Sequence, residues 1–374
     1  MSQCNARFDE IAATLGHFTC QDAPPVVHIR NPFALSHPTM PVLELMMVGG
    51  AALALWWAIR RLRRDNDPTN LVLWFASIVY LLVTEIPLYF PNLFMVEDQI
   101  GVVFDHNVFT VQFMYERLPL YIVALYPAVT TLAFEIVRTL GVFRSRGILA
   151  GSVCVGLVHQ CCYEVFDQLG PQLRWWAWNT ENPLNRPMFA SVPMTSIFIF
   201  ATLGPAVLTL LVMLLVGRRA ESGLSTVSLL WRTLAAGALV TVGVAILSIP
   251  TSIFGGSHPN TTAQAVVFVV ELAAFAAYAI PALIAAWRGG EAHGEPNQFV
   301  RIFGPIYLAV LGTLWITALP DYFAAKDGIT GGGTPTGNLP YAALCFALAV
   351  LWVALAATAT VSRDVATPSS RRPA

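Results

Sequence analysis

The sequence predicts an all-α, polytopic bundle of about nine transmembrane helices. Hydrophobic residues make up 56% of the 374-residue chain and charged residues only 11%, whereas a soluble domain carries about 25% charged residues. The mean hydropathy is +0.62. The apolar stretches are each about 20 residues long, enough for a helix to cross a hydrocarbon core about 30 Å thick. They lack the polar–apolar alternation of membrane β-barrel strands.

The apolar stretches divide the chain into three parts. An exported polar N-terminal tail is expected at residues 1–39, the helical bundle at 40–361, and a disordered inner tail at 362–374. Within the bundle we expect spans, in order, at residues 41–60, 69–90, 118–138, 147–166, 190–216, 226–253, 263–287, 302–319 and 340–361.

The arginines orient the bundle. They cluster in alternate loops, around residues 60–64, 138–146, 218–219 and 288–301 and in the C-terminal tail, and these segments hold most of the 21 basic residues. Cytoplasmic loops are enriched in Lys and Arg. We therefore expect a multi-pass protein of the inner (plasma) membrane, with the N-terminus outside and the C-terminus inside. The net charge of −1 offers no basic surface for a nucleic acid.

The cysteines do not indicate a metal site. Cys4 and Cys20 lie in the outward tail, where a disulfide is permitted but not required, and the other four lie in spans. The sequence has no CxxC or Cys/His metal spacing, and no nucleotide-binding or nucleophile-elbow motif in a usable context. We expect neither a metal nor a cofactor.

Carboxylates inside the predicted spans are the main functional signal, because an ionisable group in a bilayer is costly. There are five, namely Glu44, Glu85, Glu135, Glu164 and Glu271. Glu135 precedes Arg138 by three residues, so a helical ion pair explains it without a further role. Glu85 and Glu164 lie near the outer side, and Glu271 lies near mid-membrane. A carboxyl held in an apolar environment keeps its proton at neutral pH and can act as a general acid.

The fourth predicted span carries two polar stripes. Gln160, Glu164 and Asp167 follow i, i+4, i+7 spacing and share one face, while His159 and Tyr163 form an adjacent stripe. Three polar groups on one membrane helix favour a wet or paired environment. A lone histidine is more typical of a hydrogen-bonded packing residue than of a ligand.

Two further carboxylates each share a helix face with a tyrosine. Glu85 lies four residues before Tyr89, and Glu271 lies seven before Tyr278. Two interpretations stay open for these pairs. They could form hydrogen bonds between helices, or they could belong to a functional site.

The first two outer loops carry the other candidates. Asp105-His106 could bind a metal or act as an acid–base pair, although an exposed pair of this kind is typical of a solvated surface, as is Glu116-Arg117. The second loop holds three tryptophans: Trp175, Trp176 and Trp178. Tryptophan is enriched at membrane interfaces as an anchor, but aromatic faces also stabilise cationic centres, including carbocations.

One segment carries a family resemblance. Residues 163–193, with YEVFDQLGP, RWWAWN and SVP in order, resemble polytopic carotenoid-biosynthesis membrane proteins of the hydratase type. Those proteins are similar in having acidic residues near helix ends, followed by a Gly/aromatic loop and a Val-Pro start of a span. The resemblance implies that Glu164 and Asp167 are the positions of interest.

These observations lead to a functional hypothesis. The protein handles an apolar lipid, such as an isoprenoid, in an outward acidic and aromatic pocket, where Glu164 or Glu271 protonates a double bond for hydration or cyclisation. We predict catalytic roles for Glu164, Asp167, Glu271, Glu85 and His159, and substrate contacts from Gln160, Tyr163, Trp175, Trp176, Trp178, Tyr89, Tyr278 and Glu116.

Two other function classes stay open. The chain could be a transporter or an accessory subunit of a cell-envelope lipid export system, with a protein partner at its outer loops. It could also be a membrane scaffold without a site, in which every carboxylate is paired. Membrane lipids are expected partners in each case.

Overall fold

The computed structural model describes residues 5–15, 23–34, 37–107, 109–217, 224–256, 258–289 and 297–359. Cys4, Cys20 and the predicted inner tail at 362–374 lie outside the described residues.

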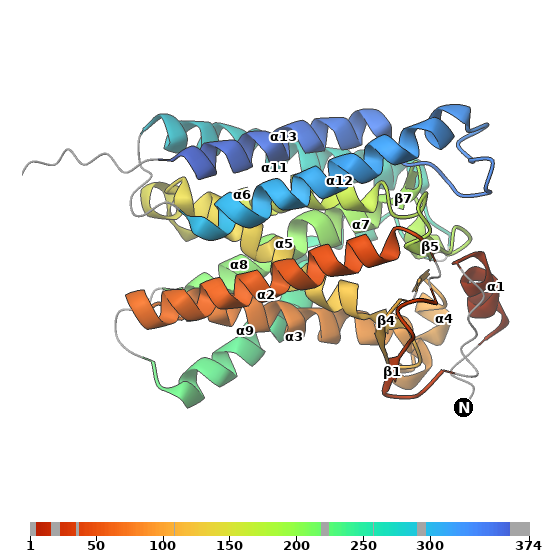
Figure 1. Ribbon diagram of the computed structural model, residues 1–374, viewed down its shortest axis with the longest axis horizontal. Helices are drawn as coiled ribbons and strands as arrows, with labels where there is room; N and C mark the ends of the chain where they lie inside the picture. The colour runs from red at the N-terminus through yellow and green to blue at the C-terminus, as the bar shows by residue number, and fades with distance from the viewer. Residues whose placement is uncertain are drawn as a thin grey trace, which may run out of the picture.

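The prediction of an all-α bundle with nine spans is confirmed. In the described part of the chain, nine helices are long and apolar enough to cross a membrane, and they run side by side in Figure 1. They are α2 (Met40–Asp65), α3 (Thr69–Tyr89), α5 (Leu120–Thr139), α6 (Val142–Asp167), the composite Met194–Leu215, α9 (Thr226–Leu247), α11 (Thr261–Arg288), α12 (Gln298–Ala324) and α13 (Leu339–Thr358).

The bundle has a centre and a periphery. Helices α5 and α6 are the most enclosed, with 89% and 78% of their most apolar window buried, whereas α11 has only 22% buried. The core is therefore built around α5 and α6. Large apolar side chains such as Val269 of α11 and Leu344 of α13 are exposed, as expected for surfaces that face lipid.

The spans α6 and Met194–Leu215 are irregular. In α6 the backbone leaves helical geometry at Gly147, where φ is 83°, so the regular part begins where the sequence analysis placed the start of the span. The composite span consists of α7 (Met194–Phe198), a π-helical turn η4 (Ile199–Leu203) and α8 (Gly204–Leu215). Turns of this kind are frequent at functional sites.

One end of the bundle, the loop end, carries nearly all of the non-helical structure (Figure 1). We define it as the described residues 5–15, 23–34, 37–39, 90–107, 109–119, 168–193 and 325–338. Here β1 (Val27–Ile29) pairs with β3 (Val111–Phe113), which pairs with β4 (Leu118–Pro119). Strand β2 (Phe104–His106) pairs antiparallel with β5 (Trp176–Trp178), and β6 (Met188–Phe189) pairs with β7 (Val192–Pro193).

Short helices complete the loop end. They are α1 (Ala6–Leu15), η2 (Pro91–Phe94), α4 (Glu97–Ile100) and η3 (Pro183–Asn185), and the four-residue helix α10 (Ile249–Ser252) follows α9. The described part of the predicted polar tail is therefore folded. Phe8 and Leu15 of α1 are buried against Val102, Tyr115 and Ala177, so α1 packs against the loop that precedes α5 and the loop that precedes α7.

The opposite end, the arginine end, is where α2, α5 and α11 finish and where α3, α6, α9 and α12 begin. It carries Arg60–Arg64, Arg138, Arg144 and Arg146. The predicted side of the membrane for each end stays a prediction.

Candidate functional site

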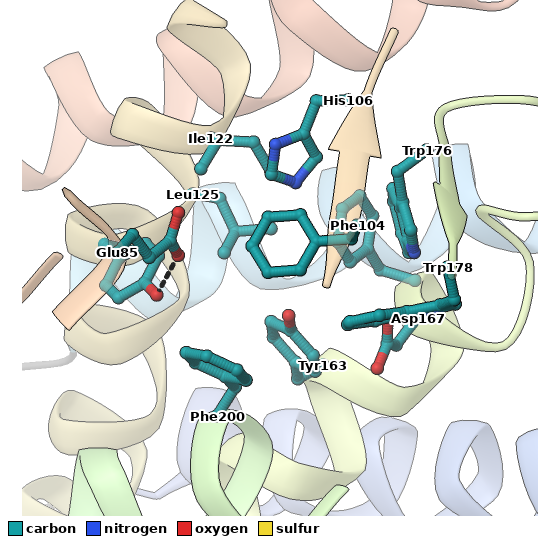
Figure 2. A pocket seen from close by; sticks show the side chains of 12 residues that line it. Glu85, Phe104, His106, Ile122, Leu125, Tyr163, Asp167, Trp176, Trp178 and Phe200 are labelled. Atoms are coloured by element: carbon teal, nitrogen blue, oxygen red, sulfur yellow. Dashed lines mark hydrogen bonds between the residues drawn. The ribbon is translucent and has the colours of Figure 1, made fainter. Parts of the chain in front are cut away.

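A small cavity lies where α3, α5, α6, the π turn and strands β2 and β5 meet near the loop end (Figure 2). Its volume is about 30 Å³, enough for about two water molecules. It is lined by Glu85, Phe104, His106, Ile122, Leu125, Tyr126, Tyr163, Phe166, Asp167, Trp176, Trp178 and Phe200. Glu85 and Asp167 lie on opposite sides, and the ring of Tyr163 lies between them (Figure 2).

Glu85 is a buried carboxyl with both oxygens engaged. The hydroxyl of Tyr89, four residues later on α3, donates to Oε2, and the hydroxyl of Tyr126 on α5 donates to Oε1. A carboxylate that receives two O–H donors is stabilised as the anion. Helical spacing predicts the pairing of Glu85 with Tyr89, but no local pattern indicates Tyr126, which comes from another span.

Asp167 has a different environment. It is the last residue of α6 and almost fully buried, and Ser196 Oγ of α7 donates to its Oδ2 at 2.9 Å. Its other oxygen, Oδ1, is buried and has no hydrogen-bond partner among the described residues. Such an orphaned oxygen beside a cavity requires an explanation: either a proton resides there or a ligand or water donates to it.

Two tryptophans of β5 form the wall nearest the loop end. Trp176 packs on Phe166, with ring centroids 4.7 Å apart, and Trp178 packs edge-on to Phe104 at 5.4 Å. The indole N–H groups of both lack a partner within the described chain. A Cβ on Gly170 would lie 2.0 Å from the ring of Trp176, so this ring position requires a glycine.

The interpretation of Asp105-His106 as a solvated surface pair is wrong. Asp105 is 2% exposed and His106 7% exposed, because the pairing of β2 with β5 holds this loop against the end of the bundle. Burial lowers the pKa of His106 to about 3 and raises the pKa of Asp105 well above its ordinary value, against the opposing charge of Arg117. His106 is therefore neutral where it lines the cavity.

Glu116 and Arg117 do not form a surface pair either. Arg117 is buried with its guanidinium 4.0 Å from the ring centre of Phe8, and its Nη1 donates to the carbonyl of Tyr89 at 2.7 Å. Glu116 accepts from His28 of β1. These contacts tie α1 and β1 to the loop end, and Glu116 does not line the cavity.

The residues of the predicted polar stripe of α6 do not all face the same neighbour: some face α13, and Asp167 faces the cavity. Gln160 donates to the hydroxyl of Tyr341 on α13, at 3.0 Å, and Glu164 accepts from Gln168 at 3.1 Å. Gln168 in turn accepts from the backbone N–H of Asn338. Residues 160, 164 and 168 therefore face α13, and Glu164 does not line the cavity. Tyr163 and Asp167, also four residues apart, line it instead.

His159 supports the site without lining it. Its Nδ1 bonds the carbonyl of Ala201 at 2.8 Å, and its ring stacks on Tyr163. Pro205 lies four residues after Ala201 and has no N–H to donate to that carbonyl. His159 thus satisfies an acceptor that a proline leaves free, which matches the packing interpretation of a lone histidine.

The other predicted residues also lie away from the cavity. Trp175 is fully buried behind Phe166, and its indole N–H donates to Thr39 Oγ1 at 2.8 Å. Glu271 and Tyr278 are on α11, the most exposed span, where Tyr278 is 53% exposed. Glu271 was predicted as a site residue because it lies near mid-membrane. Its depth, however, does not indicate which way its side chain points.

Within the described residues, no group of three or more His, Cys, Asp or Glu side chains is placed to hold a metal ion. No protein-family model, curated protein or solved structure matches the chain. The resemblance of residues 163–193 to carotenoid-biosynthesis proteins therefore stays a prediction.

Proposed function

We propose that this multi-pass protein, resident in the plasma membrane with its loop end outward, is an enzyme that adds water to a double bond of an apolar isoprenoid lipid. The observation that supports this most directly is the pair of buried carboxyls on one aromatic cavity. Glu85 has both oxygens occupied by O–H donors, whereas Asp167 has one buried oxygen without a partner.

The different environments suggest different roles for the two carboxyls. Two carboxyls in one site serve as acid and base when their surroundings separate their protonation states. Glu85, with two donors, is suited to be the carboxylate that accepts a proton. Asp167, which lines the cavity and whose Oδ1 has no partner in the described chain, is suited to hold a proton and donate it. Asp167 thus replaces Glu164 and Glu271 as the proposed acid.

The reaction then proceeds in two steps. The Asp167 O–H bond breaks and its proton forms a C–H bond at the less substituted alkene carbon, leaving a tertiary cation. A water oxygen forms the C–O bond and loses a proton to Glu85, giving a tertiary alcohol. Transfer of that proton from Glu85 back to Asp167 restores the starting state.

The aromatic wall supports a cationic intermediate. Rings of Phe104, Phe166, Tyr163, Trp176 and Trp178 line the cavity, and aromatic faces attract a positive centre in a desolvated site. Fixed groups aimed at the charge that develops in the transition state are the usual source of such catalysis.

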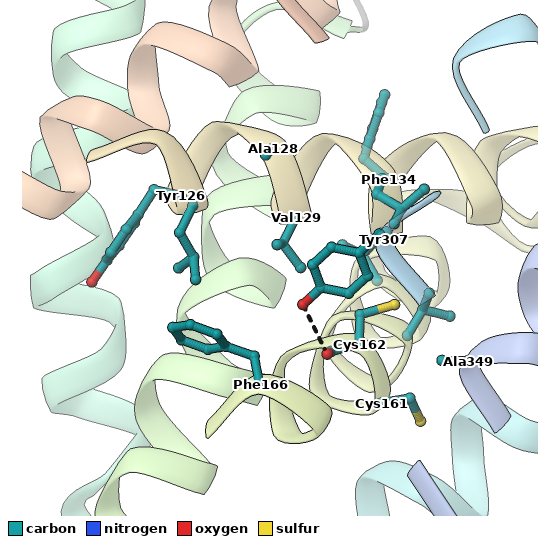
Figure 3. Packing of buried hydrophobic residues seen from close by; sticks show 14 of the residues in the cluster. Tyr126, Ala128, Val129, Phe134, Cys161, Cys162, Phe166, Tyr307 and Ala349 are labelled. Carbon is teal, nitrogen blue, oxygen red and sulfur yellow. Dashed lines mark hydrogen bonds between the residues drawn. The ribbon is translucent and has the colours of Figure 1, made fainter. Parts of the chain in front are cut away.

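The cavity holds water but is too small for a whole isoprenoid. Phe200 lines it from the π turn and is only partly buried, so we propose that the reacting end of the lipid enters from the bilayer past this side chain. In the middle of α5, Ala128 and Val129 are fully buried and belong to the packed apolar cluster that also contains Phe166 and Tyr307 (Figure 3). This packing favours a closed site over the path through the bundle that a transporter would need.

A second candidate is an accessory subunit that binds a protein partner through its outer loops. It is favoured by exposed apolar side chains at the loop end, namely Val26, Ile29, Phe33, Leu93, Phe94 and Met95. Exposed apolar surface of this kind is typical of interaction sites.

The decisive experiment measures water addition. Purified protein in lipid vesicles is incubated with linear polyisoprenoids in ¹⁸O-labelled water, and products are analysed by mass spectrometry. The proposal expects a labelled alcohol from the wild type and from Asp321→Asn, an exposed carboxylate, but not from Asp167→Asn. An unlabelled product, or an equal rate in Asp167→Asn, rejects it. Capture of a stable protein partner without any turnover supports the second candidate.

A further inference from the structure

A second, larger cavity lies at the arginine end, away from the proposed catalytic site. Its volume is about 330 Å³. It is formed by the end of α2, the start of α3, and parts of α5, α6 and α8, with Arg61, Asp67 and Arg138 on its polar side. The carboxyl chemistry proposed for Glu85 and Asp167 makes no use of it.

On the polar side of this cavity, two guanidinium groups contact the same carboxylate, that of Asp67. Arg138 donates to Asp67 Oδ2, and Arg61 Nη2 lies 3.4 Å from the same oxygen. Burial would raise the pKa of Asp67, but the charge and hydrogen bond of Arg138 and the hydrogen bonds of Thr69 together outweigh it and hold that pKa at about 2. The electrostatic environment between the two guanidinium groups therefore stabilises a negative charge.

One guanidinium N–H, on Arg61, has no hydrogen-bond partner in the described part of the chain. Arg61 also pairs with Asp65, at 2.7 Å, but its Nε is buried and finds no partner among the described residues. Arg138 donates from Nη1 to Asn70 at 2.9 Å. Each guanidinium offers five N–H donors in a planar fork that matches phosphate oxygens.

The other side of the cavity is apolar. Phe134 of α5, Phe143 of α6 and Met213 of α8 line it. A wall of this kind suits the carbon atoms that follow a lipid head group into the bilayer, not a fully hydrated ion.

The surroundings supply the excess of positive charge. Asp65 and Asp67, together with Glu135 at 3.7 Å from Arg138, outnumber the guanidinium groups of Arg61 and Arg138. Attraction for an anion therefore depends on the neighbouring charges. The end of α2 also carries Arg60, Arg63 and Arg64, and the start of α6 carries Arg144 and Arg146. Basic pockets between helices on the cytoplasmic side of a membrane favour phosphate-bearing lipid head groups.

We propose that this cavity binds the phosphate ester of an anionic membrane lipid. The phosphate contacts Arg61 and Arg138, and the glycerol and first acyl carbons lie against Phe134, Phe143 and Met213. The site is independent of the proposed hydration reaction, and it adds a specific lipid partner at the opposite end of the bundle.

Thermal unfolding in detergent tests this site with three probes: dioleoylphosphatidylglycerol, dioleoylphosphatidylcholine and inorganic phosphate. We expect phosphatidylglycerol to raise the Tm of the wild type, with little effect from the other two. Arg61→Gln should lose at least about half of this shift, because one guanidinium of the fork is removed. Arg288→Gln, which removes the same charge from an exposed position at the same end, should keep it.

A second variant keeps the proposal testable if Arg61→Gln does not fold. Met213→Trp fills the apolar side without touching a charge, and it should abolish the phosphatidylglycerol shift. Equal shifts in the wild type, Arg61→Gln and Met213→Trp overturn the proposal, because they would indicate general charge attraction. An equal shift with inorganic phosphate alone also overturns it, since the ligand would then be free phosphate.

Discussion

Two buried carboxyl clusters on the same pair of helices, α3 and α5, differ in how completely they are satisfied. At the arginine end, Glu135 of α5 accepts from Asn70 at 2.9 Å, from Trp57 at 3.1 Å and from Asn297 at 2.5 Å, with Arg138 at 3.7 Å. Near the loop end, the Glu85–Asp167 cavity keeps an orphaned carboxyl oxygen and two indole N–H groups without a partner in the described chain. Both carboxyl oxygens of Glu135 therefore have hydrogen-bond partners, whereas the Glu85–Asp167 cavity keeps polar atoms without one.

The difference separates two uses of buried polarity. The hydrogen bonds to Glu135 join helices α2, α3, α5 and α12 and leave neither of its carboxyl oxygens for a ligand, so the role of Glu135 is structural. A partly bonded cluster next to a void costs stability, and groups of this kind are expected where a ligand or a reaction completes them. Mutation of Glu135 should therefore mainly lower stability, whereas mutation of Asp167 should mainly lower activity.

The largest effect on stability is expected for Glu135→Leu. The substitution removes the carboxylate that accepts from Asn70, Asn297 and Trp57 and that lies beside Arg138. Breaking a buried charge network of this kind costs about 3–5 kcal/mol. Thermal unfolding in detergent should show a large loss of Tm. A loss no greater than that of Asp167→Asn would remove the distinction between the two clusters.

The largest effect on activity is expected for Asp167→Asn. Removing a positioned general acid lowers the rate by about 10²- to 10⁴-fold, whereas stability should change by only about 1 kcal/mol, because just one hydrogen bond, from Ser196, is affected. Rates of water addition and Tm measured on the same preparation check both parts. A strongly destabilised but active Asp167→Asn protein would contradict the functional interpretation.

A smaller effect concerns pH. The pKa of buried His106 is lowered to about 3, against about 6.5 for a free histidine. Between these values the unfolded chain binds a proton that the folded chain does not. Stability should therefore fall as pH decreases from 6.5 towards 3, by up to about 1.4 kcal/mol per pH unit.

His106→Phe isolates this contribution, because Asp105, whose raised pKa acts with the opposite sign, is present in both proteins. The difference in Tm between the variant and the wild type should depend on pH in this window. A difference that is constant with pH would show that His106 is protonated in the folded protein.

For Tyr126→Phe we expect a shift in the pH profile of turnover. It removes one of the two O–H donors to Glu85. The carboxylate form of Glu85 should become less stable by about 1.5–3 kcal/mol, the value of a hydrogen bond to a charged group. The pH profile of turnover should move to higher pH. Tyr121→Phe is a matched control, because Tyr121 donates to the backbone carbonyl of Trp175 instead, and it should leave the profile in place.

The sequence predicted part of the candidate site. Glu85, Asp167, Tyr163, Trp176 and Trp178 were singled out and line one cavity. Ser196, Tyr126, Phe104 and Phe200 were missed, because nothing in the local sequence marks a serine, a tyrosine or a phenylalanine of a membrane helix as facing a cavity. His106 was misjudged as solvated, because three-residue strands such as β2 give no local signal of burial.

By itself the sequence determined the number, order and approximate bounds of the nine helices, since length and hydropathy are local properties and a bilayer requires each span to satisfy its own backbone. It also identified the ion pair of Glu135 with Arg138, which depends only on helical spacing. Only the tertiary structure decided which way each side chain points. Lipid and protein interior are equally apolar, so the hydrophobic pattern around a membrane helix does not separate its packed face from its lipid face. For that reason Glu164 turned out to face α13 and Glu271 to lie on the exposed α11, while Asp167 faces the cavity.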